Sequence, residues 1–163
     1  MTPLSWKKEI FGSTYKLYSG ANQVGYLSQN SWTQKGTGIL NDYQYQFNNI
    51  GFFNPSTQII DVKAGKEVGK ITYNAMRTKA SIFHKGKMYE MKYNNVWNTK
   101  WMVFDREGMQ LNYQGSSTNG SVFGTGEDEL LTLAGLFISG FYRQTSIAIM
   151  VAVFVPIYVT MLS

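Results

Sequence analysis

The amino-acid sequence predicts a mainly β protein, a closed antiparallel β-barrel of about 11–12 strands around a hydrophobic C-terminal central helix. Three observations predict this fold. Short strand-like runs separated by turn residues recur every 8–12 residues or so up to Phe123. Aromatic residues, which suit pleated and half-buried surfaces, make up 15% of the chain. Residues 127–142 then lack a polar face, which is typical of a fully buried helix.

The residues before Trp101 contain most of the expected strands. Residues 1–9 are interpreted as a lead-in, with Trp6 as an anchor. Side chains alternate in the clearest strand, where Lys70 and Thr72 share one face and Ile71 lies on the other. With turn residues as boundaries, the expected strands are 15–18, 23–28, 36–40, 43–47, 58–62, 68–73, 79–83, 87–93, 101–104, 109–113 and 120–123.

A weak internal repeat connects two of these hairpins. Residues 20–27 and 65–71 both consist of a turn followed by Val-Gly, at Val24-Gly25 and Val68-Gly69. A glycine inside a strand usually marks a bulge or the close approach of another backbone. The repeat therefore predicts two related halves in a pseudo-symmetric closed sheet.

The change of period after the last strand predicts the central helix, 127–142. Thr125 is expected to cap it, and the acids at 127–129 then place negative charge in the first turn, where the helix dipole favours it. A helix over 127–142 would be about 24 Å long, which fits a barrel lumen of roughly 17–24 Å. Gly135 and Gly140 lower the helix propensity, so packing is expected to hold the helix together.

Residues 144–163 form a second apolar segment whose location the sequence leaves open. Arg143 marks the point where the chain would leave the barrel, and Pro156 is expected to kink a following helix. Residues 146–163 form an 18-residue stretch, which is near the lower limit of length for a helix that spans a bilayer. The segment is a candidate membrane anchor with Arg143 on the cytoplasmic side. The alternative is that it packs inside the core or in a dimer.

Composition argues against several kinds of active site. The chain has no cysteine, which excludes disulfides, thiolate metal sites and a cysteine nucleophile. His84 is the one histidine, so neither a zinc site nor a Ser-His-Asp triad is expected, and it is interpreted as a hairpin-turn residue. The acids at 127–129 are explained by the helix dipole without a metal. We therefore expect neither an enzyme nor a cofactor.

The best binding candidate is a basic tract between Lys63 and Lys92. These thirty residues hold eight cations against Glu67 and Glu90, while the whole chain has a net charge of +5. Such a surface could face the phosphate groups of anionic lipid. Nucleic acid is disfavoured, because the aromatic alternation at 43–47 is more simply a barrel wall. The candidate head-group-binding residues are Lys63, Lys66, Lys70, Arg77, Lys79, Lys85, Lys87 and Lys92.

The order of these parts resembles the tubby C-terminal-like superfamily, which includes tubby proteins, phospholipid scramblases and LURP-one-related proteins. The residues that carry the resemblance are the run 65–71, the segment 52–54, the hairpins around 83–87 and 104–108, and the Asp-Glu-Leu-Leu sequence at 128–131. The resemblance implies a twelve-stranded barrel around a central helix and an association with membrane phosphoinositides or bilayers. The acidic calcium loop discussed for scramblases is not found in this sequence.

Two functions follow as expectations. The first is a non-enzymatic, membrane-associated, lipid-binding barrel in the cytoplasm or on the cytoplasmic face of a membrane. The N-terminus has the features of neither a secretory signal nor its cleavage site. The alternative is a soluble interaction protein, or a binder of a small apolar ligand, with residues 144–163 buried in the core or in a dimer. The sequence does not indicate a protein partner.

Overall fold

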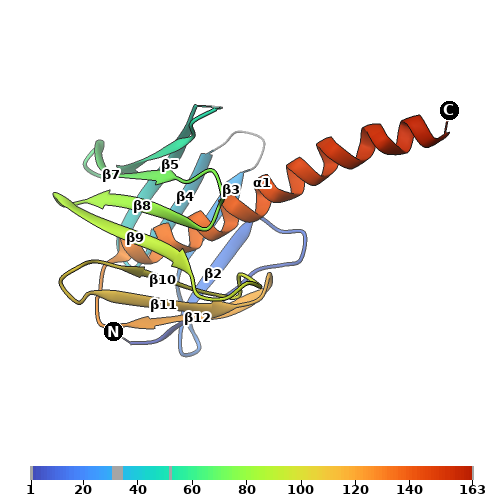
Figure 1. Cartoon of the computed structure of the whole chain (residues 1–163). Coiled ribbons are helices and arrows are strands. Elements are labelled where there is room, and N and C mark those ends of the chain that lie inside the picture. Colours follow the sequence, from blue (N-terminus) through green and yellow to red (C-terminus); the bar gives the residue numbers. More distant parts are fainter. Residues whose placement is uncertain (1, 31–34, 52, 163) are drawn as a thin grey trace.

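The protein is a closed antiparallel barrel of twelve strands with one long helix through it (Figure 1). A computed structural model describes residues 2–30, 35–51 and 53–162. All eleven predicted strands are present, and the predicted fold class is confirmed. The strands are β1 (Leu4–Lys7), β2 (Thr14–Ser19), β3 (Asn22–Asn30), β4 (Lys35–Leu40), β5 (Tyr43–Ile50), β6 (Ser56–Asp61), β7 (Lys66–Tyr73), β8 (Lys79–His84), β9 (Lys87–Tyr93), β10 (Lys100–Phe104), β11 (Gln110–Gly115) and β12 (Asn119–Gly124).

The twelfth strand, β1, closes the barrel. It pairs with β2 on one side and with β12 on the other, where Trp6 lies opposite Gly120. The interpretation of residues 1–9 as a lead-in is therefore wrong for Leu4–Lys7, although Trp6 is buried as an anchor would be. A four-residue strand is too short to show alternation, and its partner β12 lies more than a hundred residues away in the sequence.

The Val-Gly repeat marks two β-bulges, as predicted. The register shifts opposite Val24 in the pairing of β2 with β3, and opposite Val68 in the pairing of β6 with β7. Each bulge frees a carbonyl for the next hairpin: Asn41 donates to the Val24 carbonyl, and His84 bonds to the Val68 carbonyl. The two hairpins lie four strands apart, so the repeat relates thirds of a twelve-stranded barrel and not halves.

Helix α1 (Glu129–Leu162) fills the barrel lumen with its first part. Phe137 stacks on Phe47 of β5 with ring centroids 4.6 Å apart. Asp128 caps the helix, because its Oδ1 accepts the backbone N–H of Leu131 at 3.0 Å. The prediction of Thr125 as the cap is wrong, since its hydroxyl bonds to Gln110 and Gly108 instead. The buried helix residues include Leu130, Leu131, Leu133, Ala134, Leu136, Phe137, Ile138 and Tyr142.

The two helix glycines let strand side chains reach the helix backbone. Tyr113 packs where a Gly135 side chain would be, and Gln29 packs in the same way at Gly140. The Tyr113 hydroxyl donates to the Leu131 and Thr132 carbonyls. Packing against the barrel therefore compensates for the low helix propensity of glycine.

The two apolar segments predicted from the sequence form one continuous helix. Burial ends after Tyr142, residues 143–146 are half-buried, and the described side chains from Ile147 onward are exposed. The barrel exit at Arg143 is therefore confirmed, whereas packing of residues 147–162 inside the core is contradicted. The helix continues through Pro156. Figure 1 shows this part of α1 projecting well beyond the barrel.

The barrel has two unlike ends. At the cap end, where α1 begins, Lys85 and Asn41 reach Asp128 and Glu129. At the exit end, where α1 leaves, the Tyr142 hydroxyl donates to the Lys79 carbonyl at 2.5 Å and accepts from the Asn74 backbone N–H. Since consecutive strands are antiparallel, the connections β1–β2, β5–β6, β7–β8, β9–β10 and β11–β12 lie at the exit end, where β3 also ends and β4 begins, and the other described connections lie at the cap end.

Candidate functional site

The charges of the chain are segregated between the two ends of the barrel. Nine cations lie at or toward the exit end against one acid, Glu9, whereas the cap end has five cations against eight acids. Lys70 and Glu90 lie between the ends. Beyond its net charge of +5, the protein therefore has a strong separation of charge along the barrel axis, with the positive end at the exit end. The exit-end cations are Lys7, Lys8, Lys16, Lys35, Arg77, Lys79, Lys92, Lys100 and Arg143.

The same end carries a rim of exposed apolar side chains on its loop tips. The β1–β2, β5–β6, β7–β8 and β9–β10 connections each contribute at least one, and these side chains are between 70% and 101% exposed. In the described connections of the cap end, the exposed large hydrophobic residue is Val62, at 44%. Apolar tips grouped on one face mark an interaction surface. This apolar rim consists of Ile10, Phe11, Phe53, Met76, Val96 and Trp97.

Helix α1 leaves through the middle of this end. Its exposed part contains large apolar side chains on all sides, among them Ile149, Val153 and Phe154. By length and composition α1 is able to cross a membrane, and the apolar window that meets this criterion has no residue buried inside the structure. A helix that is apolar all round and not buried in protein needs another apolar environment.

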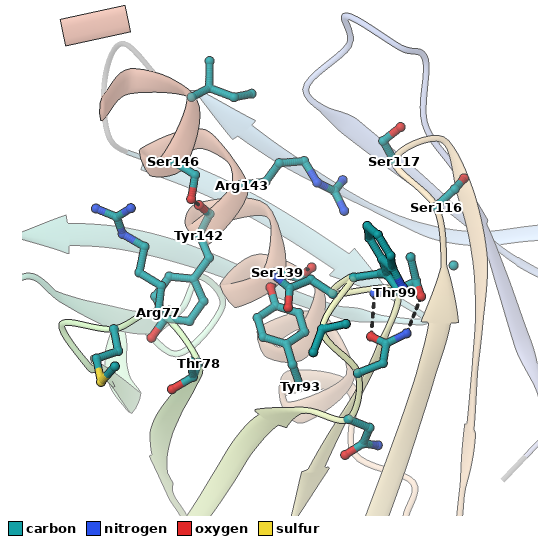
Figure 2. A pocket seen from close by; sticks show the side chains of 18 of the residues that line it. Arg77, Thr78, Tyr93, Thr99, Ser116, Ser117, Ser139, Tyr142, Arg143 and Ser146 are labelled. Carbon is teal, nitrogen blue, oxygen red and sulfur yellow. Dashed lines mark hydrogen bonds between the residues drawn. The ribbon is translucent and has the colours of Figure 1, made fainter. Parts of the chain in front are cut away.

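A pocket of about 950 Å³ opens beside the helix at the exit end. Its walls are the β7–β8, β9–β10 and β11–β12 connections and one side of α1. In Figure 2, Arg77 and Arg143 lie on opposite sides of Tyr142, and Ser116 and Ser117 lie beyond Arg143. The described lining side chains include two arginines and no acid. Apolar groups line its outer part, where Ile147 and Met150 project from the helix.

Among the residues that the structure describes, none supplies an anion to Arg143 in this pocket. Its Nη1 atom is buried, and no described residue accepts a hydrogen bond from it. The pKa of nearby Lys8 is lowered, first by burial and then by the positive charge of Arg143. The Lys8 ammonium bonds only to backbone carbonyls, of Glu9 and Gly12, among the described residues. Neighbouring cations thus repel each other in a place that an anion would stabilise.

The structure does not bring the eight predicted head-group residues together. Lys63, Lys66, Lys85 and Lys87 lie at the cap end, and Lys70 lies midway along β7. Lys85 pairs with Asp128 at 3.0 Å, and Lys87 pairs with Glu107. The other three predicted residues, Arg77, Lys79 and Lys92, belong to the exit-end cations.

At the cap end, His84 and Asp128 tie a hairpin to the helix. The His84 ring lies 2.7 Å from the Val68 carbonyl through Nδ1 and 3.3 Å from Asp128 Oδ2 through Nε2. Asp128 also accepts from Lys85, so its carboxylate has the partners of a structural link. A pocket of about 820 Å³ lies here too, but five carboxylates line it. No group of His, Cys, Asp or Glu suited to a metal ion occurs among the residues that the structure describes.

Sequence reasoning missed the apolar rim and did not assign six of the exit-end cations to a binding surface, although it placed one of them, Arg143, at the barrel exit. Lys7, Lys8, Lys16, Lys35, Lys100 and Arg143 are scattered through the sequence and meet only when the barrel closes. One signal was available: in an antiparallel barrel, alternate connections share an end. Grouping the loops in this way would have separated loops with apolar tips from acidic loops.

Comparisons of this chain with protein-family models, with curated proteins and with solved structures found no match.

Proposed function

We propose that this protein is a non-enzymatic, membrane-associated barrel that binds anionic lipid with its exit end. The observation that carries the proposal is the coincidence, at one end, of an exposed apolar helix, an apolar rim and nine cations. The helix enters the hydrocarbon, the loop tips lie at the membrane interface, and the cations face the head groups. The barrel then stands on the membrane with its acidic cap end in the cytoplasm.

The charge distribution supports this orientation. Anionic lipids are enriched in the cytoplasmic leaflet of the membrane. Each Lys or Arg close to that surface contributes about 1 kcal/mol of attraction to it. The exit end has nine such residues, whereas the cap end carries more acids than bases. Residues 147–162 would extend about 24 Å as a helix, which reaches most of the way through a hydrocarbon core of about 30 Å.

The architecture also supports a relationship with the tubby C-terminal-like superfamily. A closed twelve-stranded barrel threaded by a hydrophobic helix is what that resemblance implies. We therefore extend the proposal to a lipid-binding role similar to that of tubby proteins or phospholipid scramblases. The calcium loop discussed for scramblases is not part of the proposal.

A flotation experiment with vesicles tests the proposed function. The wild-type chain should float with phosphatidylglycerol-containing vesicles, and Val153→Asp should reduce its vesicle-bound fraction. A carboxylate at the middle of a membrane helix costs about 2.5–3.5 kcal/mol, on the order of a hundredfold in partitioning. Val153 is exposed, so the substitution should leave the barrel folded. Val62→Asp, the same change at the cap end, is the matched control and should float like the wild type.

Two results would count against the proposal. One is flotation of Val153→Asp that equals that of the wild type. The other is a wild-type chain that remains in the aqueous fraction as a defined dimer, with the exposed helix covered by a second copy. That second result would favour the soluble interaction protein considered from the sequence.

A further inference from the structure

The exit-end pocket combines two chemically different walls. Its inner part holds Arg143, Arg77 and hydroxyl groups such as Ser139 and Thr99. Its outer part holds Val96 and Trp97 of the β9–β10 connection, and these apolar side chains are exposed. In Figure 2, Arg143 extends from the helix toward the loops that carry Thr99, Ser116 and Ser117, whereas Arg77 lies on the other side of Tyr142. A ligand that fits both walls is an amphiphile with an anionic, oxygen-rich head.

Arg143 provides the strongest indication of the charge of the ligand. Its guanidinium has five N–H donors, yet the buried Nη1 has no acceptor among the described residues. An unsatisfied buried donor on a charged group is costly, whereas bidentate contact with a phosphate satisfies the planar fork. The described lining residues include no Asp or Glu, so a counter-charge for Arg143 would have to be supplied from outside.

The position of the pocket indicates where the ligand comes from. Met150 and Ile147 line it from the first exposed turns of α1, directly beyond the half-buried stretch 143–146. If the helix enters a bilayer as proposed above, this mouth lies at the depth of the lipid head groups. The acyl chains of a lipid whose phosphate reaches Arg143 would then follow the apolar surface of α1 into the membrane.

We infer that this pocket binds one anionic glycerophospholipid, with its phosphate on Arg143 and its acyl chains along Ile147 and Met150. The inference rests on the proposed function and adds a discrete site with a stoichiometry of one. It differs from a diffuse attraction between exit-end cations and a charged surface, because the polar groups of the pocket select one head group. Hydroxyl and amide groups around the arginines, including Ser116 and Asn98, complete the polar wall.

Native mass spectrometry of the full chain in detergent micelles tests the inference. The probes are phosphatidylglycerol, phosphatidylcholine, diacylglycerol and inorganic phosphate. The wild type should bind one phosphatidylglycerol, phosphatidylcholine more weakly because its choline cation meets two arginines, and no diacylglycerol. Removal of a charged hydrogen-bond partner, in Arg143→Gln, should weaken phosphatidylglycerol binding about tenfold or more.

Control variants separate the pocket from general charge. Arg77→Gln, on the β7–β8 connection, should also weaken binding and keeps the test decisive if Arg143→Gln does not fold. Lys63→Gln removes the same charge from an exposed position at the cap end and should bind phosphatidylglycerol like the wild type. Circular dichroism of each variant establishes that the barrel is folded.

Three outcomes would overturn the inference. Wild-type affinity in both arginine variants would show that the pocket is not the site. Full competition by millimolar inorganic phosphate would identify a site for soluble anions instead of lipid. Equal loss of binding in Lys63→Gln would indicate diffuse attraction. Because micelle binding and vesicle flotation are measured separately, a chain that floats without a one-to-one lipid complex refutes the pocket and leaves the proposed function standing.

Discussion

At the residue scale, Asp128 joins the helix to the barrel wall. One carboxylate oxygen caps α1 at the Leu131 amide, and the other lies next to His84 and Lys85 of the β8–β9 hairpin. Burial by itself raises the pKa of Asp128. Hydrogen bonds from His84, Leu131 and Lys85 lower the pKa by a larger amount, so that the pKa of Asp128 falls to about 2. The ionised form is therefore the one that the fold stabilises.

This arrangement predicts how acid affects the fold. An aspartate in the unfolded chain has a pKa of about 3.9. The folded pKa lies below that value, so the contribution of Asp128 is complete above the unfolded pKa and is lost as the pH falls toward about 2. Asp128→Asn keeps a good cap but removes the charge. It should lower the thermal unfolding midpoint at pH 7 and flatten its decrease between about pH 4 and pH 2.

The measurement is circular dichroism of the full chain in detergent micelles across that pH range. Asp42→Asn, at an exposed position in the β4–β5 turn of the same end, is the control and should retain the wild-type pH profile. An unchanged profile in Asp128→Asn would show that the carboxylate does not hold the helix to the hairpin.

At the element scale, α1 has two parts with different surroundings. Up to Tyr142 it is the core of the barrel, and Trp101 donates from Nε1 to the Gly135 carbonyl at 3.1 Å. Beyond Ser146 its described side chains are exposed. One helix therefore connects the folded core rigidly to the apolar segment, so the orientation of that segment fixes the orientation of the barrel.

The close packing at Gly135 predicts a double-mutant coupling. A methyl group there would overlap the Tyr113 ring, whose hydroxyl is held by two helix carbonyls. Gly135→Ala should therefore lower the free energy of unfolding by about 1–3 kcal/mol. Tyr113→Ala makes room, so the double variant should be less destabilised than the sum of the two single variants. Denaturant unfolding in micelles measures this, and strict additivity would contradict the packing.

The strands could be predicted from the sequence more completely than the distribution of charged side chains over the surface of the barrel. The strands between 15 and 123 follow from turn residues and alternation, which are local signals. Closure by β1, capping by Asp128 and the contact of His84 with the helix depend on pairings between distant residues. The basic tract was visible as composition, but the antiparallel topology divides it between two ends. A linear charge count therefore could not locate the positive end of the barrel.

At the scale of the whole molecule, the two ends of the barrel differ in charge and in exposed apolar surface. The cap end is acidic and its described loops are largely polar, whereas the exit end is basic and carries the apolar rim and the helix. Charge segregation of this kind orients a protein at an anionic surface before any contact is made. The central claim is that the exit end, and not the cap end, faces the membrane.

Single-cysteine labelling tests this claim most directly, because the natural chain has no cysteine. An environment-sensitive fluorophore would be placed on Val96→Cys at the exit end or on Ala64→Cys at the cap end, both exposed. With phosphatidylglycerol vesicles, the label at position 96 should shift to the blue and be quenched by brominated lipid, while the label at 64 keeps its aqueous spectrum. Equal responses at the two positions, or a response only at position 64, would contradict the claim.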